Sequence, residues 1–346
     1  MREINSIEIK EAAQVGAARR VIHGFASRIG FNENQLAEID IVVQEIGTNA
    51  VAYTTSGGWL HFTTPVNSAG IELFYWDMGP GIYNPERAIR DGVSTGGSLG
   101  AGMGAIRRLM DEFDVYSTVR ATGRLTLAAQ RRTTHGTALL ARKWLDAEQE
   151  SNPSTEARQI GVWSRPCPNE TDNGDAYFIG PRGARTLYAV VDGLGHGSGA
   201  KAASDVALGA LSEWRGEPLD QVLRVAHDAL RATRGAVMSA VLIDRAERSF
   251  QFAGVGNVAV RVFNAPERVT AISTNGTLGA RLGQIRVWTH AWAEGATCVM
   301  ASDGISAAWE MDAYPGLLAH SPQLLAGILM RDYSRLSDDA TVLVIK

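Results

Sequence analysis

Cysteine is scarce in this chain, which has two such residues, Cys167 and Cys298, among 346. They lie in unrelated contexts and form no CxxC pair, which argues against a disulfide framework and a zinc site and fits a reducing compartment. No apolar run reaches the length of about 20 residues that a membrane-spanning helix needs. Residues 1–5 are polar and charged, unlike the start of a signal peptide. We therefore expect a cytoplasmic protein with no membrane partner.

An excess of basic charge is also missing, because the formal net charge is −4. The chain therefore lacks the electrostatic footprint of a polyanion-binding protein, and nucleic acid is not an expected partner. Hydrophobic residues make up 45% of the chain and charged residues 20%, which is typical of globular proteins. A length of 346 residues allows two domains.

The composition changes at residues 146–158, which carry proline, serine and glutamate and lack large apolar side chains. Such a segment can bury little surface, so we predict a linker here. The two predicted domains are residues 1–145 and residues 159–346.

The first domain is predicted to be of the α+β class, with helices placed before and between mostly hairpin-linked strands. Apolar residues at helical spacing indicate the helices, and short apolar runs indicate the strands. The predicted helices are residues 9–29, 33–53 and 103–110, and the predicted strands are residues 59–65, 71–76, 114–119, 124–129 and 137–141.

The second domain is predicted to be richer in strands. The predicted strands are residues 160–164, 176–179, 186–191, 236–243, 249–254, 258–263, 285–292, 297–301 and 340–345, and the predicted helices are residues 200–214, 219–233 and 323–331.

Acidic residues stand at the ends of four of these strands: Asp175, Asp192, Asp303 and the pair Asp338-Asp339. Each lies beside glycine or another acid. Carboxylate oxygens suit Mg²⁺ and Mn²⁺, and glycine lets backbone carbonyls and waters approach an ion. A single Asp-Gly is more often a turn, but the joint pattern favours two cations that activate a water and clamp a phosphoryl group. We therefore predict a metal-dependent hydrolase.

This half of the chain resembles the SpoIIE/RsbX branch of the metal-dependent (PPM, type 2C) serine/threonine phosphatases, over about residues 159–346. The matching motifs are Asn173-Gly174-Asp175, Asp192-Gly193-Leu194-Gly195-His196-Gly197, Ser302-Asp303-Gly304 and Ser337-Asp338-Asp339. The resemblance implies an αββα sandwich with a centre of two Mn²⁺ or Mg²⁺ ions.

The same resemblance implies the roles of the acids. Asp192 would be catalytic by bridging both metals, and the Gly193 carbonyl would join Asp175 on one of them. Asp303 and Asp338 would serve the other metal. The sequence alone does not separate Asp338 from Asp339 as the ligand.

Two further residues allow two interpretations each. Arg165 could bind phosphate, although a solvated arginine is the commoner case. His196 could act as an acid for the leaving group, and a loop histidine with a structural hydrogen bond is at least as common.

In the first domain, Glu45 and Asn49 lie four residues apart and so share one face of a predicted helix. Asp77 ends an apolar strand within Asp77-Met78-Gly79-Pro80-Gly81. A glycine-rich run over residues 94–104 then opens the next predicted helix, where backbone N–H groups can close around phosphates. GxxxxGK[ST] is absent, so this is not a P-loop. Taken alone, the glycine run could be a flexible loop, and Glu45 with Asn49 a solvated helix face.

Together these motifs resemble the GHKL (Bergerat-type) ATPases, and in particular the anti-sigma-factor serine kinases of the RsbT/RsbW kind, over about residues 5–145. The resemblance implies a GHKL α/β sandwich that binds ATP with Mg²⁺. It implies Mg²⁺ binding by Asn49, adenine recognition by Asp77 with help from Thr137, and a general-base role for Glu45 toward an acceptor serine. The remaining nucleotide contacts would come from glycines: Gly79, Gly81, Gly100, Gly102 and Gly104.

The two resemblances together predict a phosphoserine/phosphothreonine phosphatase fused to an ATP-binding, serine kinase-like domain. They imply a shared partner, a STAS-domain protein that is either an anti-sigma-factor antagonist or a stressosome scaffold protein. The main alternative is that only the phosphatase is catalytic and the first domain senses ATP or docks the partner. Sequestration of the partner without catalysis is a third hypothesis, which the intact acids disfavour. The oligomeric state is not set by the sequence.

Overall fold

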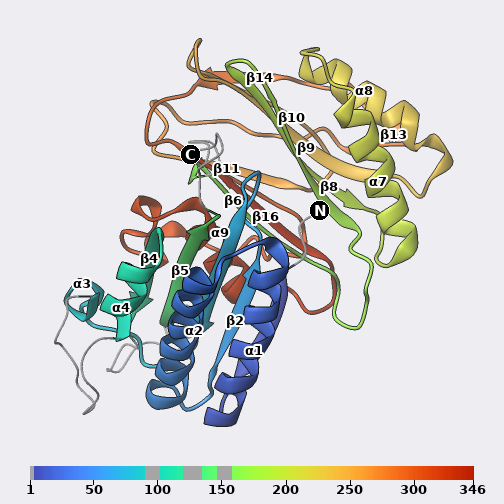
Figure 1. Ribbon diagram of the computed structural model, residues 1–346. Helices are drawn as coiled ribbons and strands as arrows, with labels where there is room; N and C mark the ends of the chain where they lie inside the picture. Colours follow the sequence, from blue (N-terminus) through green and yellow to red (C-terminus); the bar gives the residue numbers. More distant parts are fainter. Residues whose placement is uncertain (1–3, 90–101, 120–134, 146–157) are drawn as a thin grey trace, which may run out of the picture. The chain divides into compact units, whose positions relative to one another are not determined.

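The computed structural model describes residues 4–89, 102–119, 135–145 and 158–346 (Figure 1). The chain divides into two compact units. The first unit holds Arg2–Gln159 together with Glu310–Ile328, and the second holds Ile160–Trp309 and Leu329–Lys346. The predicted linker at residues 146–158 lies outside the described residues, apart from Arg158.

The first unit is built on one antiparallel sheet with the strand order β1-β2-β3-β5-β4. Its strands are β1 (Asn5–Ile9), β2 (Gly58–Thr63), β3 (Gly70–Asp77), β4 (Glu112–Thr118) and β5 (Gly136–Trp144). Figure 1 shows α1 and α2 side by side against this sheet. The helices before the second unit are α1 (Ala12–Ile29), α2 (Glu33–Tyr53), α3 (Pro85–Ile89) and α4 (Gly102–Leu109).

Local signals explain the bounds of the two long helices. Asn32 caps α2 by accepting a hydrogen bond from the Gln35 backbone N–H, and the Gln35 side chain accepts one from the Asn32 N–H, which forms a capping box. Gly30 ends α1 with a φ of 107°, a left-handed conformation that glycine adopts without strain. The apolar faces of α1, α2 and α4 then pack with one face of the sheet in a single core.

The other face of this sheet is covered by the segment Glu310–Ile328, which comes from the second half of the sequence. Leu73 and Tyr75 of β3 belong to the helix-facing core, so the intervening Phe74 points the opposite way. Phe74 is buried, and its ring lies against Gly327 of α9 (Pro322–Tyr333) so closely that a Cβ at Gly327 would come within 2.3 Å of it. Both faces of the sheet are therefore packed.

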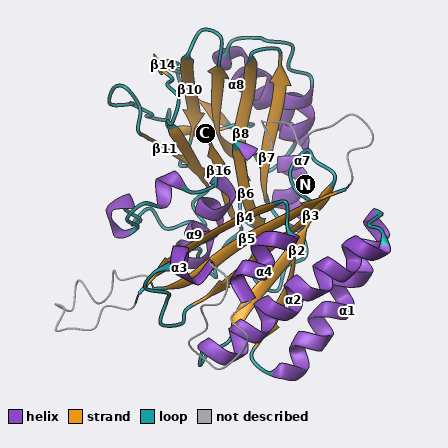
Figure 2. Ribbon diagram, turned by 60° about the vertical axis from the view of Figure 1, so that its left-hand side comes forward, coloured by secondary structure: helices purple, strands orange, loops and turns teal. Residues whose placement is uncertain are grey.

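The second unit contains two larger antiparallel sheets, with the strand orders β14-β10-β9-β8-β7 and β11-β15-β16-β6. Figure 2 shows α7 (Ser198–Ser212) and α8 (Leu219–Ala229) lying along the first of these sheets, where they share a core with it. The strands of the first sheet are β7 (Asp175–Arg182), β8 (Arg185–Gly193), β9 (Ala236–Asp244), β10 (Ser249–Val255) and β14 (Trp288–Ala291). The strands of the second are β6 (Ile160–Arg165), β11 (Ala259–Phe263), β15 (Thr297–Ala301) and β16 (Ala340–Ile345).

The predicted fold class, an α+β chain with a GHKL-type sandwich followed by a PPM-type sandwich, is confirmed. Two local predictions were wrong, and one small element was not predicted. The first helix begins at Ala12, not near Ile9, because Asn5–Ile9 pairs with β2 as an edge strand. The strand predicted over 285–292 is confined to Trp288–Ala291. A small ribbon was missed, formed by β12 (Gly276–Thr277) and β13 (Arg281–Leu282).

Some predictions fall on residues that the structure does not describe, among them the strand at 124–129 and Gly100. Within the described ranges, no helix has both the length and the apolar character that a membrane crossing requires.

Candidate metal centre and nucleotide site

Strand pairing brings the predicted metal acids of the second unit together. Asp175 begins β7 and Asp192 lies near the end of β8, and the two residues are direct partners in the antiparallel register. Asp303 follows β15 by two residues and Asp338 precedes β16 by two residues, and these two strands are also paired. The four acids therefore lie near one another, close enough for the charges of Asp175, Asp303 and Asp338 to act on Asp192.

A pocket of about 400 Å³ opens where these strands end. Three of the acids line it, namely Asp192, Asp303 and Asp338. The rest of the lining consists of small, apolar and amide-bearing residues: Leu194, Gly195, Val237, Gly256, Asn257, Asn275 and Gly276. Three carboxylates thus line the pocket, and none of its lining residues is basic.

Electrostatic repulsion in this cluster is strong. Burial raises the pKa of Asp192 far above its usual value, and the nearby carboxylates of Asp175, Asp303 and Asp338 raise it further. Burial also raises the pKa of Asp175, against the hydrogen bond that Ser302 donates to it. A cluster that holds several carboxylates at neutral pH against such costs is stabilised by cations.

The two adjacent acids at the end of the chain have different surroundings. Asp339 is buried, and its carboxylate accepts hydrogen bonds from the backbone N–H groups of Cys167 at 2.7 Å and Gly174 at 2.9 Å. Asp338 lines the pocket. This geometry favours Asp338 as the residue that faces an ion and gives Asp339 the task of holding the loop before Asp175.

The donor set fits a hard cation that keeps part of its water shell. Among the described residues, no three histidine, cysteine or acidic side chains converge into a ready-made metal cluster. Mg²⁺ is usually bound through one or two carboxylates and retains several waters, so pairs of these acids suffice. Gly193 can add its carbonyl, and its position admits no side chain, since a Cβ would lie 2.2 Å from the Ala200 carbonyl oxygen.

Three supporting residues of the site were missed by the sequence analysis. The Ser302 hydroxyl donates to Asp175 at 2.6 Å, Asn257 Nδ2 donates to Asp303 Oδ2 at 2.9 Å, and Ser204 Oγ hydrogen bonds the Gly174 carbonyl. Ser302 lies inside a motif that the sequence analysis singled out. No sequence signal marks Asn257, because it reaches Asp303 only through the turn between β10 and β11.

The structure also separates the interpretations of Arg165. Its guanidinium donates to the backbone carbonyls of Pro166 at 2.9 Å, Arg335 at 2.5 Å and Asp338 at 3.4 Å. Arg165 is therefore half-buried and engaged by three backbone carbonyls, and it ties the end of β6 to the segment that carries the last acids. His196 lies with Nδ1 at 3.0 Å from Glu170 Oε1, a half-exposed pair that agrees with a structural hydrogen bond.

In the first unit, Asp77 is the centre of a buried polar network. Its Oδ1 accepts hydrogen bonds from the backbone N–H groups of Gly79 at 2.7 Å and Thr137 at 3.2 Å. The Thr137 hydroxyl lies 3.0 Å from Ser117 Oγ, which in turn accepts from the Ile82 N–H at 2.7 Å. Asp77 is thus fixed by the two segments that the sequence analysis assigned to nucleotide binding, which lie 60 residues apart.

The turn after Asp77 needs its glycine. Gly81 has a φ of 77°, and a Cβ there would lie 2.0 Å from the Thr118 carbonyl oxygen. His135 adds a contact between its Nδ1 and the Gly79 carbonyl at 2.8 Å. The backbone of this turn is therefore pressed against β4.

Glu45 and Asn49 of α2 face the first turn of α4. A Cβ at Gly102 would lie 3.2 Å from Glu45 Oε2 and 3.5 Å from Asn49 Nδ2. The structure therefore brings both residues to the start of the helix that follows the glycine run, and Gly104 is buried within the same helix. Gly100 and the rest of the run up to residue 101 lie outside the described residues.

Two family models match the chain. The model described as "Histidine kinase-like ATPase domain" matches residues 10–128, and the model described as "Stage II sporulation protein E (SpoIIE)" matches residues 182–346.

Two curated proteins of Bacillus subtilis (strain 168) are similar to the two halves. The serine/threonine-protein kinase RsbT is 29% identical over 146 residues, which cover 42% of this chain and 99% of RsbT. The phosphoserine phosphatase RsbX is 25% identical over 135 residues, which cover 38% of this chain and 67% of RsbX.

Among solved structures, one is a chain from work on the bacterial stressosome, "a modular system that has been adapted to control secondary messenger signaling". It is 30% identical, with a TM-score of 0.51, over 54% of this chain and 98% of that chain. Kinase-like and phosphatase-like relatives thus match separate halves of this protein, which is a fusion of an RsbT-like, histidine kinase-like ATPase domain and a phosphatase domain of the SpoIIE family.

Proposed function

We propose that this protein sets the phosphorylation state of a STAS-domain protein, removing phosphate from serine or threonine with its second unit and binding ATP, for phosphate transfer, with its first. The observation that carries the proposal is the meeting of Asp175, Asp192, Asp303 and Asp338 at paired strand ends beside an acidic pocket. The relatives RsbT and RsbX support both halves.

In the phosphatase unit, Mn²⁺ or Mg²⁺ held by these acids and the Gly193 carbonyl would supply an activated water and charge neutralisation for the phosphoryl group. The chain's own contribution is to position the ligands. Asp339 fixes the loop before Asp175 through Cys167 and Gly174, and Ser302 orients the Asp175 carboxylate. Asp192 is the strand partner of Asp175 and lines the pocket with Asp303 and Asp338, so it would be the residue shared by both ions.

In the first unit, Asp77 is buried and one of its carboxylate oxygens is fixed by two backbone N–H groups, and this carboxylate would recognise the adenine amino group. Asn49 would hold Mg²⁺. Glu45, beside Gly102 at the start of α4, would take the proton of an acceptor serine. The glycines at 79, 81, 100, 102 and 104 and Thr137 would complete the nucleotide site.

Fusion supports a shared partner. When one site on the chain binds a protein, the other site is held close to it, so its effective concentration near that protein rises without any new contact. The partner would be a phosphorylated STAS-domain protein of a partner-switching pathway, either an anti-sigma-factor antagonist or a stressosome scaffold protein. Similarity to a serine/threonine kinase, a phosphoserine phosphatase and a chain from stressosome work supports this choice.

The first test is hydrolysis of an aryl phosphate by the purified protein with Mn²⁺, comparing wild type with Asp192→Asn. We expect turnover that requires Mn²⁺ and is lost in the variant. The same assay with ATP would show whether nucleotide binding changes the rate. Turnover that is equal in the variant, or absent at every Mn²⁺ concentration, would move the proposal from catalysis to partner binding.

The kinase half is tested by Glu45→Ala. If the first unit transfers phosphate, this variant loses transfer from ATP to a STAS-domain substrate but keeps its affinity for ATP. If the first unit only senses ATP or docks the partner, Glu45→Ala leaves both the phosphatase rate and its response to ATP unchanged.

A further inference from the structure

The pocket beside the metal acids lacks a cation of its own, although a phosphoester substrate carries up to two negative charges. Its lining residues comprise three aspartates and no basic side chain. Arg165, the basic residue nearest in sequence to the first strand of this unit, is committed to the carbonyls of Pro166, Arg335 and Asp338. These residues therefore offer a substrate phosphate no cationic side chain, so any such contact beside the metal ions must come from another segment.

Arg234 lies against the loop that follows Asp192. A Cβ at Gly199 would come within 2.4 Å of the Arg234 Cζ, and a Cβ at Gly195 would lie 3.6 Å from one of its terminal nitrogens. Gly195 itself lines the pocket. Glycine at these two positions thus leaves room for the guanidinium to lie along the loop, at the side of the pocket.

The backbone around Arg234 is held firmly to the same loop. The Gly235 carbonyl accepts a hydrogen bond from the Leu194 N–H at 3.1 Å, and the Gly235 N–H donates to Thr233 Oγ1 at 3.0 Å. Thr233 Oγ1 in turn donates to the Leu230 carbonyl at 2.8 Å. These bonds tie the base of the arginine to the residues beside Asp192.

The guanidinium of Arg234 makes no hydrogen bond or ion pair with any residue in the described part of the chain. Its five N–H donors are therefore available to an external acceptor. Arginine presents them in a planar fork that matches two phosphate oxygens, which a point charge such as lysine does not.

We propose that Arg234 binds the phosphate of the substrate at the side of the metal pocket, and so serves as a substrate-binding residue of the phosphatase. This rests on the proposed phosphatase function of the same site. Arg335 is the rival, because its charge acts on Asp338, but its backbone is hydrogen-bonded to Gly304 and Arg165, and Arg335 does not line the pocket.

The test compares Arg234→Met with wild type in Mn²⁺-dependent aryl phosphate hydrolysis and in binding of inorganic phosphate to the Mn²⁺-loaded protein by calorimetry. Loss of a charged hydrogen-bonding partner corresponds to roughly a tenfold or larger change in affinity. We expect KM and the phosphate dissociation constant to rise by about that factor, with Mn²⁺ affinity unchanged. Arg231→Met, at an exposed arginine paired with Asp228, is the matched control.

Gly199→Ala gives an independent test, because the new methyl group must push the guanidinium aside. Alanine in the first turn of α7 favours the helix, so weaker phosphate binding would accompany equal or higher thermal stability. The effect should vanish when Gly199→Ala is added to Arg234→Met, since the displaced group is then already absent.

The outcomes separate the two proposals. Unchanged KM and phosphate binding in Arg234→Met, or a loss seen only in Arg335→Met, would overturn the role of Arg234 and leave the phosphatase intact. A wild type without Mn²⁺-dependent turnover would overturn the proposed function, and the calorimetric comparison with inorganic phosphate would still test Arg234.

Discussion

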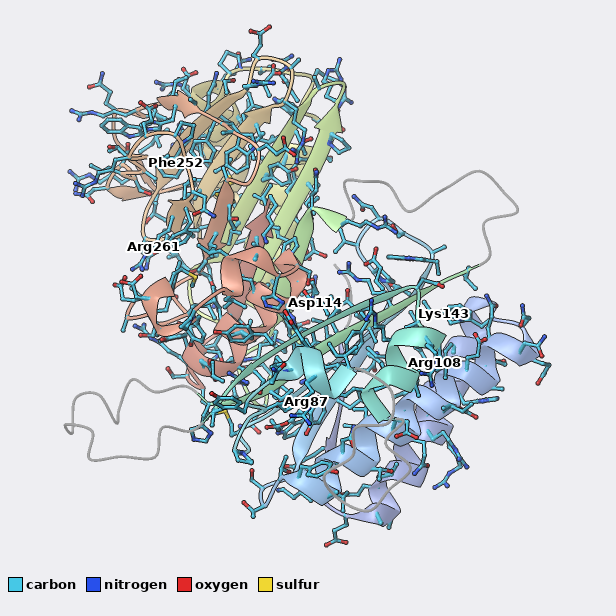
Figure 3. The ribbon with its side chains drawn as sticks, turned by 90° about the vertical axis from the view of Figure 1, so that its left-hand side faces the viewer. Arg87, Arg108, Asp114, Lys143, Phe252 and Arg261 are labelled. Carbon is cyan, nitrogen blue, oxygen red and sulfur yellow. The ribbon has the colours of Figure 1, made fainter. Side chains whose placement is uncertain are left out.

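The imidazole Nδ1 of His320 lies 2.7 Å from Asp114 Oδ1, although 206 residues separate them in the sequence. The other carboxylate oxygen of Asp114 accepts a hydrogen bond from the Ser321 N–H at 2.7 Å. Asp114 is labelled in Figure 3, and it lies in β4 of the first unit. The His320 ring also packs edge-on against the Tyr116 ring, with 5.3 Å between the ring centroids. Asp114 and Tyr116, both in β4, therefore contact the segment just before α9. This contact belongs to the first unit, which includes Glu310–Ile328.

This contact should make the stability of the first unit depend on pH. Burial alone would raise the pKa of Asp114, but hydrogen bonds from His320 and Ser321 outweigh burial and lower it. A carboxyl with a lowered pKa stabilises the folded state above its unfolded pKa, near 4, and loses that contribution as the pH falls through the lower folded value. At neutral pH, Asp114→Asn should cost about 1–3 kcal/mol, and the difference from wild type should shrink below about pH 4.

Hydrogen exchange of peptides from β4 and from the start of α9 measures this effect locally. The matched control is Asp228→Asn, which removes an exposed carboxylate from an i,i+3 pair with Arg231 and should change protection little. If Asp114→Asn exchanged like wild type at pH 7, the contact would not hold the segment to the sheet.

A buried ion pair inside the same sheet gives a larger prediction. Arg142 is 3% exposed and Glu72 is 1% exposed, and the Arg142 Nε donates to Glu72 Oε2 at 2.8 Å. Arg142 also donates to Glu112 Oε2 at 3.1 Å, so Arg142→Leu would remove a cation from two carboxylates, one of them buried, and should cost about 3–5 kcal/mol. Removing both charges in Arg142→Leu with Glu72→Leu should recover much of this loss.

Calorimetric unfolding of the full chain checks this pair. We expect a lower transition temperature in the single variant than in the double variant. Equal destabilisation in both would mean that lost packing, and not the unpaired charge, determines the cost.

Several elements could be predicted from the sequence because their signals are local. The helix over 33–53 was predicted with its observed bounds, since a capping box marks its start and apolar periodicity its length. The strands at 297–301 and 340–345 were also predicted with their observed bounds, because both are short, continuous apolar runs that are buried along their length.

The features that could not be predicted depend on distant partners. Asn5–Ile9 becomes a strand only because β2, about 50 residues later, offers an edge to pair with. The gathering of the acids could be predicted because they stand at strand ends. The choice between Asp338 and Asp339 could not, because it depends on the direction that the turn before β16 gives each side chain. Nothing local in residues 310–328 indicates that this segment covers the sheet of the first unit.

Asn257 should tune metal affinity without being a metal ligand itself. Its Nδ2 donates to Asp303 Oδ2 at 2.9 Å at the edge of the pocket that both residues line, and so holds the orientation of that carboxylate. Loss of such an orienting hydrogen bond typically weakens metal binding by about 10–100-fold. Asn257→Ala should therefore raise the half-saturating Mn²⁺ concentration within that range, with the number of bound ions unchanged.

Equilibrium binding of Mn²⁺, followed without substrate, separates this effect from catalysis. Asn84→Ala is the control, because Asn84 caps a short helix of the first unit through the Arg87 N–H. A half-saturating concentration that is the same in Asn257→Ala and wild type would show that Asp303 needs no orienting partner.

Asp192→Asn should change thermal stability in opposite directions with and without metal. Burial and three neighbouring carboxylates raise its pKa, so its charged form destabilises the fold at any pH above its unfolded pKa of about 4 when no cation is present. Asp192→Asn should therefore raise the thermal unfolding temperature in a chelator. In Mn²⁺ the order should reverse, because an ion that binds only the folded wild type stabilises it in proportion to the logarithm of its concentration.

Thermal unfolding of both proteins, with chelator and over a series of Mn²⁺ concentrations, measures both differences in unfolding temperature directly. Parallel stabilisation of the variant and the wild type by Mn²⁺ would mean that Asp192 is not a ligand, whereas a variant less stable than wild type in the chelator would mean that its hydrogen bonds outweigh the repulsion.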